Sequence, residues 1–307
     1  TGTEEAWFMA GAENLTGIHF LLTYRCSASC AHCFVWGDPS HRGAIPREDV
    51  TRYLDEALEM GTITGIFIEG GEVFTEYADL KWFIGQCSER GWDVSILSNG
   101  FWAKTEEIAR KRLQPLIDAG LTGMSLSTDE YHQPFVPLER VEIAARVAEE
   151  LGVNVGRMGT PADRVMFRGR AADSLAPGKE DDRAAWQTFT ECTREKLETP
   201  GRIHLDKYGM LHLCQGLAMD SARNKPLADA IEGYDPKSHP IVRLLLDGGP
   251  ARLAQAAQTH GFVPRDDYAD ECQLCYEARK HLRDRYPDYL GPAEVYGETD
   301  PAPALAR

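Results

Sequence analysis

The 307-residue chain lacks three features that would place it in a membrane, outside the cell or on nucleic acid. No apolar run approaches the roughly 20 residues of a membrane-spanning helix, which excludes a helical membrane protein. Residues 1–8 show no basic segment followed by an apolar core, so there is no apparent signal peptide and we expect a cytoplasmic protein. Basic residues are few: 33 Lys and Arg against 48 Asp and Glu give a net charge of −15, which disfavours a nucleic-acid substrate because like charges repel.

Cysteine, in contrast, is present in a pattern that simple core filling does not explain. In a reducing compartment, clustered thiols usually hold metal rather than form disulfides. Three of the eight cysteines lie within eight residues, and two form a Cys-x-x-Cys pair near the C-terminus. The cysteines are Cys26, Cys30, Cys33, Cys87, Cys192, Cys214, Cys272 and Cys275.

Segments typical of buried strands alternate with segments that carry apolar residues at helical spacing. After the first, the strands begin about thirty residues apart, the length of one βα unit, which predicts a parallel sheet. The alternation favours an α/β fold of the partial (βα)6 TIM-like barrel type, although a doubly wound sheet has the same period. Strands are predicted at 17–24, 62–69, 92–97, 122–127, 153–158 and 165–168, and helices at 46–60, 77–90, 104–119 and 138–151.

The composition changes after the last of these strands. A polar linker at 171–183 precedes a predicted β-hairpin at 201–214, which turns at residues 206–209. We therefore expect the barrel to occupy 1–171 and a small hairpin-plus-helices extension to occupy 172–286. Short helices are predicted at 240–246, 251–260 and 272–283, and an extended tail at 287–307.

Cys26, Cys30 and Cys33 directly follow the first predicted strand. Three thiolates at this spacing can hold three irons of a 4Fe-4S cluster and leave the fourth iron open. A structural zinc site prefers four closed ligands and would need His32 or His41 as the fourth.

The spacing Cys26-x3-Cys30-x2-Cys33, with the ring of His32 before the last cysteine, resembles the signature of the radical S-adenosylmethionine (SAM) superfamily. The resemblance implies a 4Fe-4S cluster that binds SAM. It also implies reductive cleavage of SAM to a 5′-deoxyadenosyl radical, which abstracts a hydrogen from the substrate. A reductase such as flavodoxin or ferredoxin would be the electron-donating partner.

Other strand ends carry residues that match the same family pattern. Gly70-Gly71-Glu72 ends the second strand, where glycines permit close approach of a ligand and a carboxylate can balance the ammonium group of SAM. By resemblance, polar residues at the later strand ends contact its ribose and carboxylate. These predicted cofactor-binding residues are Gly70, Gly71, Glu72, Ser98, Asn99, Ser127, Asp129 and Arg157. No catalytic residue is assigned by the pattern. The two candidates are His132 and Arg170, the latter in a Gly169-Arg170-Ala171 segment that is also typical of the family.

A second cysteine group surrounds the predicted hairpin. Cys192-x16-Gly209-x4-Cys214 resembles the opening of the C-terminal extensions called SPASM and twitch domains, and Cys272 and Cys275 complete four thiolates. Four thiolates suit one auxiliary 4Fe-4S cluster, or equally a zinc ribbon. Cys87 has no partner in the sequence and is predicted to be a buried structural thiol.

The resemblance implies an oxidoreductase or maturase that modifies a peptide by oxidation or cross-linking, as the maturases of ribosomally made peptides do. A dehydrogenase or epimerase acting on a small molecule such as an aminosugar is the alternative. A non-catalytic iron–sulfur or zinc protein, serving as a scaffold or electron carrier, is the alternative of another class.

Overall fold

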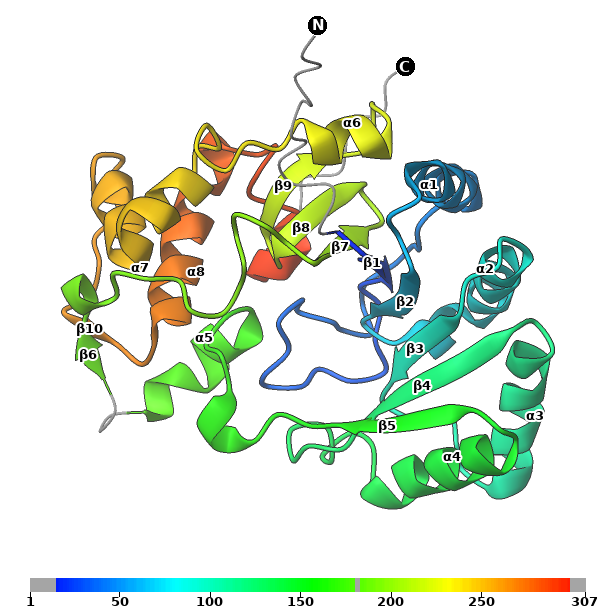
Figure 1. Ribbon diagram of the computed structural model, residues 1–307. Helices are drawn as coiled ribbons and strands as arrows, with labels where there is room; N and C mark the ends of the chain where they lie inside the picture. Colours follow the sequence, from blue (N-terminus) through cyan, green and yellow to red (C-terminus); the bar gives the residue numbers. More distant parts are fainter. Residues whose placement is uncertain (1–14, 180–182, 299–307) are drawn as a thin grey trace, which may run out of the picture.

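The computed structural model describes residues 15–179 and 183–298, and an eight-stranded sheet forms its centre (Figure 1). The strand order is β5-β4-β3-β2-β1-β7-β8-β9, and β5 and β9 do not pair, so the sheet is not closed. The fold is an α/β partial barrel, as predicted. The parallel strands are β1 (Gly17–Thr23), β2 (Gly65–Gly70), β3 (Val94–Ser98), β4 (Leu121–Ser127), β5 (Asn154–Met158) and β7 (Arg202–Asp206); β8 (Met210–Cys214) and β9 (Leu217–Ser221) are antiparallel.

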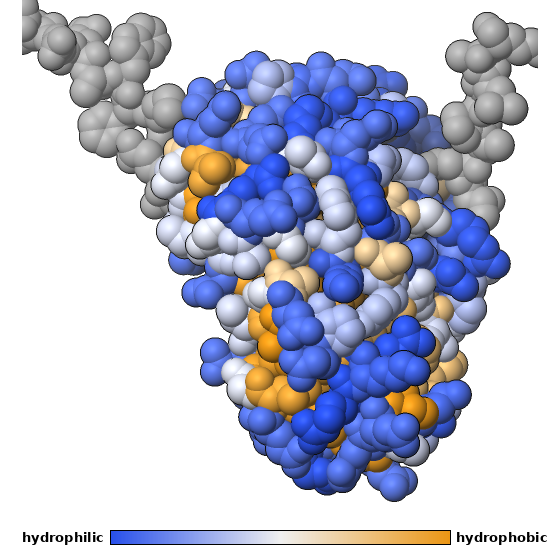
Figure 2. Space-filling view, turned by 90° about the vertical axis from the view of Figure 1, so that its right-hand side faces the viewer, coloured by the Kyte–Doolittle hydropathy of each residue, from blue (hydrophilic) through white to orange (hydrophobic). Residues whose placement is uncertain are grey.

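Four helices follow the first four strands and cover the outer face of the sheet (Figure 1). Their apolar stripes pack on alternate strand residues, as when Phe20 of β1 meets Phe83 with ring centroids 4.9 Å apart. The opposite faces of these helices are mainly hydrophilic, as Figure 2 shows. Among the described residues, no helix is both long and apolar enough to cross a membrane. The helices are α1 (Arg47–Met60), α2 (Tyr77–Glu89), α3 (Glu106–Ile117) and α4 (Leu138–Glu150).

The alternation of side chains along the strands separates the helix-covered core from the inside of the barrel. On β1, Ile18, Phe20 and Leu22 belong to the main hydrophobic core, so His19 and Leu21 point to the inner face. The inner face carries many polar side chains, and the functional residues described below lie on it or at its rim.

The predicted sixth strand at 165–168 is wrong. Its polar groups bond to the C-terminal part of the chain instead of to β5: the Phe167 N–H donates to Asp270 Oδ2 (3.1 Å), and Arg168 donates to Glu195 Oε1 (3.1 Å). The sixth parallel strand is β7, the first strand of the predicted hairpin, and it pairs with β1 on the other side of the sheet.

The hairpin of β7 and β8 is confirmed, and its turn is bonded to the barrel. The buried carboxylate of Asp206 accepts hydrogen bonds from the Tyr24 hydroxyl (2.8 Å), from His212 Nε2 (3.1 Å) and from the backbone N–H groups of Tyr208 and Met210. Tyr24 directly follows β1, so this network joins the extension to the start of the cysteine loop.

The helices of the extension pack beside β7–β9 (Figure 1). The predicted helices at 240–246 and 251–260 are two parts of one element, α7 (Val242–Gln258), which is interrupted by non-helical backbone at Gly248 and Gly249. The predicted helix at 272–283 is α8 (Glu271–Leu282). Also present are α5 (Arg170–Ser174), α6 (Leu227–Glu232) and a two-stranded sheet of β6 (Ala184–Ala185) and β10 (Asp267–Tyr268).

The prediction of an extended tail is wrong for residues 287–298. This segment includes a 3-10 helix at Ala293–Tyr296 whose residues are buried. Tyr296 stacks on Tyr276 with centroids 5.3 Å apart and donates its hydroxyl to the Gly216 carbonyl (2.6 Å). Apolar burial holds the segment against the fold despite its proline content. Residues 299–307 of the predicted tail lie outside the described residues.

Candidate functional site

A cavity at the rim of the parallel strands brings together most of the predicted site residues. It contains all three cysteines of the first group, the two glycines at the carboxyl end of β2, and polar residues from the ends of β3 and β4. Phe34, Val35 and Leu97 add apolar wall. Of the predicted residues, the lining includes Cys26, Cys30, Cys33, Gly70, Gly71, Ser98, Asn99, Ser127, Asp129 and His132.

The cysteine loop places three thiols on one wall of this cavity. Cys26 and Cys30 are buried and pack together, and Cys33 packs beside them. The backbone N–H of Gly37 points at Cys33 Sγ (3.1 Å). Burial raises the pKa of Cys30 to about 12, and it raises the pKa of Cys26 further. Isolated thiolates are therefore unfavourable here, and bound metal is the chemistry that would let all three sulfurs carry charge.

Gly169 and Arg170 hold this loop from outside the cavity. Arg170 donates from Nη1 to the Cys30 carbonyl (2.8 Å) and from Nη2 to the Gly37 carbonyl (2.9 Å). Gly169 has a φ of +59°, and a Cβ there would lie 2.5 Å from the Cys33 carbonyl oxygen. The prediction that Arg170 is a catalytic candidate is therefore wrong: its guanidinium is committed to backbone carbonyls, and it is a positioning residue.

Gly70 and Gly71 allow the end of β2 to pack directly against the start of the cysteine loop. A Cβ at Gly70 would lie 2.3 Å from the Thr23 carbonyl oxygen, and one at Gly71 would lie 2.3 Å from that of Arg25. The Gly71 N–H donates to the Thr23 carbonyl (2.7 Å). Both glycines line the cavity, but the close approach that requires them is made by the protein's own backbone.

Glu72 lies behind the cavity wall rather than in its lining, which differs from the prediction. Its carboxylate accepts hydrogen bonds from Ser98 Oγ (2.8 Å), from the Asn99 N–H (2.7 Å) and from the Phe74 N–H (3.1 Å). Burial raises the pKa of Glu72 to about 7 despite these donors. Glu72 therefore fixes Ser98 and Asn99, both of which line the cavity.

Arg157 does not reach the cavity, and its predicted contact with the carboxylate of SAM is wrong. It pairs with Glu142 (3.1 Å) and Glu149 (3.2 Å) of α4, on the outside of the barrel. The register explains this, since Arg157 pairs with the core residue Leu126, whereas Met158 pairs with Ser127 and lines the cavity. Ser127 faces the cavity, and its partner on β5 faces the same side of the sheet. That partner is Met158, which the sequence analysis did not consider.

An Asp–His pair forms another part of the wall. His132 Nδ1 donates to Asp129 Oδ1 (2.7 Å), and His32 Nε2 lies 3.4 Å from Asp129 Oδ2. Burial acts to raise the pKa of Asp129, but the bonds from His132 and His32 outweigh it and hold that pKa well below its usual range. His132 thus faces the cavity as predicted, and the carboxylate of Asp129 is already engaged by histidines.

The second cysteine group also comes together in space. Cys214 ends β8, Cys272 and Cys275 lie in the first turns of α8, and Cys192 comes from an irregular segment. Cys214 is close enough to each of the other three for their charges to interact. Cys87, in contrast, is buried in the main core, as predicted.

Two buried arginines that the sequence analysis missed face this second group. Arg168 Nη1 donates to Cys214 Sγ (2.9 Å), and Arg168 also lines the first cavity, so it touches both sites. Arg279 is 1% exposed, with Nη2 3.9 Å from the same sulfur. The sequence did contain a clue to Arg279: it follows Cys275 by four residues in a predicted helix, and this spacing places the two side chains on the same helix face.

The site thus lies in an open α/β sheet, with a three-cysteine loop at the carboxyl end of the first strand. A comparison with known families matches this part of the chain. The model of the radical SAM superfamily matches residues 20–161.

Two curated relatives share part of this region. Over 115 residues the chain is 30% identical to "Putative peptide biosynthesis protein YydG" of Bacillus subtilis (strain 168), which covers 38% of this chain and 36% of that protein. Over 120 residues it is 28% identical to "Antilisterial bacteriocin subtilosin biosynthesis protein AlbA" of the same organism, covering 38% of this chain and 25% of that protein. The matches thus span about a third and a quarter of the relatives' lengths.

Among solved structures, Streptococcus suis SuiB bound to S-adenosylmethionine aligns at a TM-score of 0.41 and 13% identity, covering 92% of this chain and 77% of that one. This is a loose overall likeness.

We expect Arg170→Ala to loosen the cysteine loop, because it removes two hydrogen bonds from a charged donor to the Cys30 and Gly37 carbonyls. Such bonds contribute about 1.5–3 kcal/mol each, so amides at 26–38 should exchange at least about tenfold faster. Hydrogen-exchange mass spectrometry measures this directly. Arg157→Ala is the matched control, since that arginine is bonded only on the outer surface. Equal exchange in both variants would contradict the positioning role.

Proposed function

We propose that the chain is a radical SAM enzyme in which Cys26, Cys30 and Cys33 hold a 4Fe-4S cluster and the adjoining cavity binds SAM. The observation that carries the proposal is the convergence of all three thiols with Gly70 and Gly71 in one cavity at the strand ends. When bound, the cluster and SAM supply one-electron chemistry and a 5′-deoxyadenosyl radical able to take a hydrogen atom from a substrate.

The residues of this chain then have distinct tasks. Arg170 keeps the loop carbonyls in place, so the sulfurs keep their positions. Glu72 fixes Ser98 and Asn99 at the cavity wall, where the Asn99 side-chain amide also donates to Ser27 Oγ (3.1 Å) in the cysteine loop. The apolar wall, including Phe34, excludes water from the space where a reactive species would form.

We expect anaerobically reconstituted protein, given SAM and dithionite, to form 5′-deoxyadenosine, which liquid chromatography quantifies. Cys30→Ala should lose this activity almost entirely, because two thiols cannot hold the cluster. Cys87→Ala is the control, since Cys87 is a core thiol remote from the cavity, and it should retain activity. Absence of 5′-deoxyadenosine from the unsubstituted protein would refute the enzyme proposal.

We further propose that Cys192, Cys214, Cys272 and Cys275 hold an auxiliary 4Fe-4S cluster in a twitch-like extension covering 172–286. The buried guanidiniums of Arg168 and Arg279 support this, because they offset the negative charge that four thiolates carry. A buried arginine is costly without an anion, so these positions suit charged sulfur better than neutral thiols.

For the auxiliary site, Cys214→Ala should halve the iron and sulfide content of the reconstituted protein while leaving 5′-deoxyadenosine formation from SAM. Colorimetric iron and sulfide assays give the count. Cys26→Ala should also halve it, but with loss of SAM cleavage. If Cys214→Ala instead loses zinc and keeps all its iron, the site is a zinc ribbon.

We propose a peptide as the substrate and an oxidative or cross-linking modification as the outcome. The support is that one curated relative is named for peptide biosynthesis and the other for biosynthesis of a bacteriocin. Arg168, which lines the cavity and donates to Cys214 Sγ, supports a position of the proposed auxiliary cluster beside the proposed substrate space.

We expect co-expression with a short peptide encoded beside the gene to yield a peptide lighter by two hydrogen atoms, detected by high-resolution mass spectrometry. The mass change reflects removal of a hydrogen atom, an electron and a proton from the substrate. Cys30→Ala is the matched inactive control. An unmodified peptide together with turnover on an aminosugar would contradict the peptide assignment and favour a small-molecule enzyme.

A further inference from the structure

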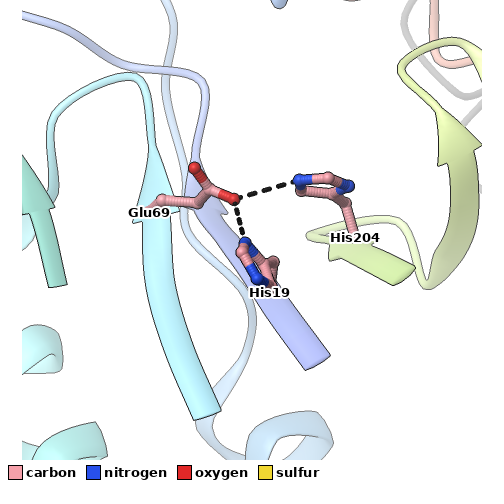
Figure 3. A group of neighbouring side chains, drawn as sticks. All are labelled: His19, Glu69 and His204. Carbon is pink, nitrogen blue, oxygen red and sulfur yellow. Dashed lines mark hydrogen bonds and ion pairs between the residues drawn. The ribbon is translucent and has the colours of Figure 1, made fainter. Parts of the chain in front are cut away.

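Two histidines and a glutamate converge inside the barrel, apart from both cysteine groups (Figure 3). His19 comes from β1, Glu69 from β2 and His204 from β7. His19 Nδ1 lies 2.9 Å from Glu69 Oε1, and His204 Nε2 lies 3.1 Å from the same oxygen. The three ligand atoms all lie within 4.8 Å of one another.

The sheet register produces this convergence. His19 is the direct partner of His204 across the β1–β7 pair, and Leu21, two residues along β1, is the partner of Glu69. Ile18, Phe20, Ile203 and Leu205 all belong to the helix-covered core, so the residues between them face the inside. Because β1 lies between β2 and β7, the three side chains reach one point from three adjacent strands.

The protonation states suit a cation. Burial opposes ionisation of Glu69, but hydrogen bonds from His19 and His204 outweigh it and lower its pKa to about 2. Burial lowers the pKa of His204, so its imidazole is neutral near pH 7. A charged carboxylate beside a neutral imidazole is the state in which these groups bind metals.

We propose that His19, Glu69 and His204 bind one divalent transition-metal ion such as Zn²⁺. Two imidazoles and one carboxylate form a recurrent zinc-binding set, which leaves a fourth position open for water. With metal–ligand bonds of about 2.0–2.1 Å, tetrahedral ligand atoms lie about 3.3 Å apart. The two nitrogen–oxygen spacings, 2.9 and 3.1 Å, therefore need to open by only a few tenths of an ångström, and the two histidine nitrogens already lie within 4.8 Å of each other.

An ion can reach the site from solvent, and each imidazole can bind it once the proton on its ligating nitrogen has moved to the other ring nitrogen. The His19 side chain is 26% exposed, which gives an ion a route to the group. In the metal-bound state each imidazole carries its proton on the ring nitrogen that faces away from the ion. For His204 this is Nδ1, which has no hydrogen-bond partner among the described residues. The ion would tie β7 of the extension to β1 and β2 of the barrel.

The test is zinc loading of the holoprotein, whose cysteines are first filled with iron and sulfide. After incubation with zinc sulfate and desalting, mass spectrometry of the metals should find about one more zinc per chain in the unsubstituted protein than in His204→Gln or Glu69→Gln, with equal iron. His281→Gln, at an exposed histidine of α8, is the matched control and should retain the zinc. Equal zinc in all four proteins would overturn the proposal.

His132→Gln separates this site from the His32, Asp129 and His132 cluster in the cavity. Zinc lost in His132→Gln and retained in His204→Gln would place the ion there and overturn the proposal. Zinc X-ray absorption of the unsubstituted holoprotein requires no variant to fold: nitrogen and oxygen ligands at about 2.0–2.1 Å are expected, and sulfur at about 2.3 Å would overturn the proposal.

Discussion

The close backbone contact between the end of β2 and the cysteine loop is the constraint on which the site depends. At Gly71 even a methyl group would lie 2.3 Å from the Arg25 carbonyl oxygen, and at Gly169 a Cβ would lie 2.5 Å from the Cys33 carbonyl oxygen. The loop is thus held between two glycines far apart in the sequence, and Arg170 bonds its carbonyls from the same side as Gly169. Three thiols on one cavity wall follow from this packing, because both sides of the loop backbone are fixed and its cysteines are buried together.

Charge is arranged differently at the two cysteine groups. Beside the first, the Arg170 guanidinium is bonded to loop carbonyls, whereas at the second the guanidiniums of Arg168 and Arg279 face the sulfur of Cys214 directly. Glu195 balances part of the charge of Arg168, whereas Arg279 is bonded to the Gln215 carbonyl and has Cys214 Sγ as its neighbour, so negative sulfur would stabilise both buried cations. Nearby charge and hydrogen bonds to sulfur set the reduction potential of an iron–sulfur cluster, so the two proposed clusters would differ in potential.

The amino-acid sequence predicted the structure correctly wherever a local pattern of residues determines it. The strands and helices from β1 to β5 were predicted because each alternates or repeats its own apolar residues, and the three-cysteine spacing identified the cavity loop. The errors came from contacts distant in sequence. Residues 165–168 look like a strand, but Phe167 bonds to Asp270. Arg157 lies one residue out of phase with the inner face, which only the pairing with β4 reveals. The roles of Glu72 and Arg168 depend on partners 26 and 46 residues away, which no local pattern indicates.

The continuous sheet limits how the two halves of the molecule can move. β1 pairs with β2 on one side and with β7 on the other, so the predicted boundary near residue 171 does not separate two independently packed bodies. The Asp206–Tyr24 bond reinforces this β1–β7 seam at its carboxyl end, and the His19–Glu69–His204 group reinforces it at its middle. Hinge motion there would break strand hydrogen bonds and expose buried polar groups together, a cost that flexible linkers between domains avoid. The cavity and the second cysteine group are therefore held at a fixed separation, with Arg168 in contact with both.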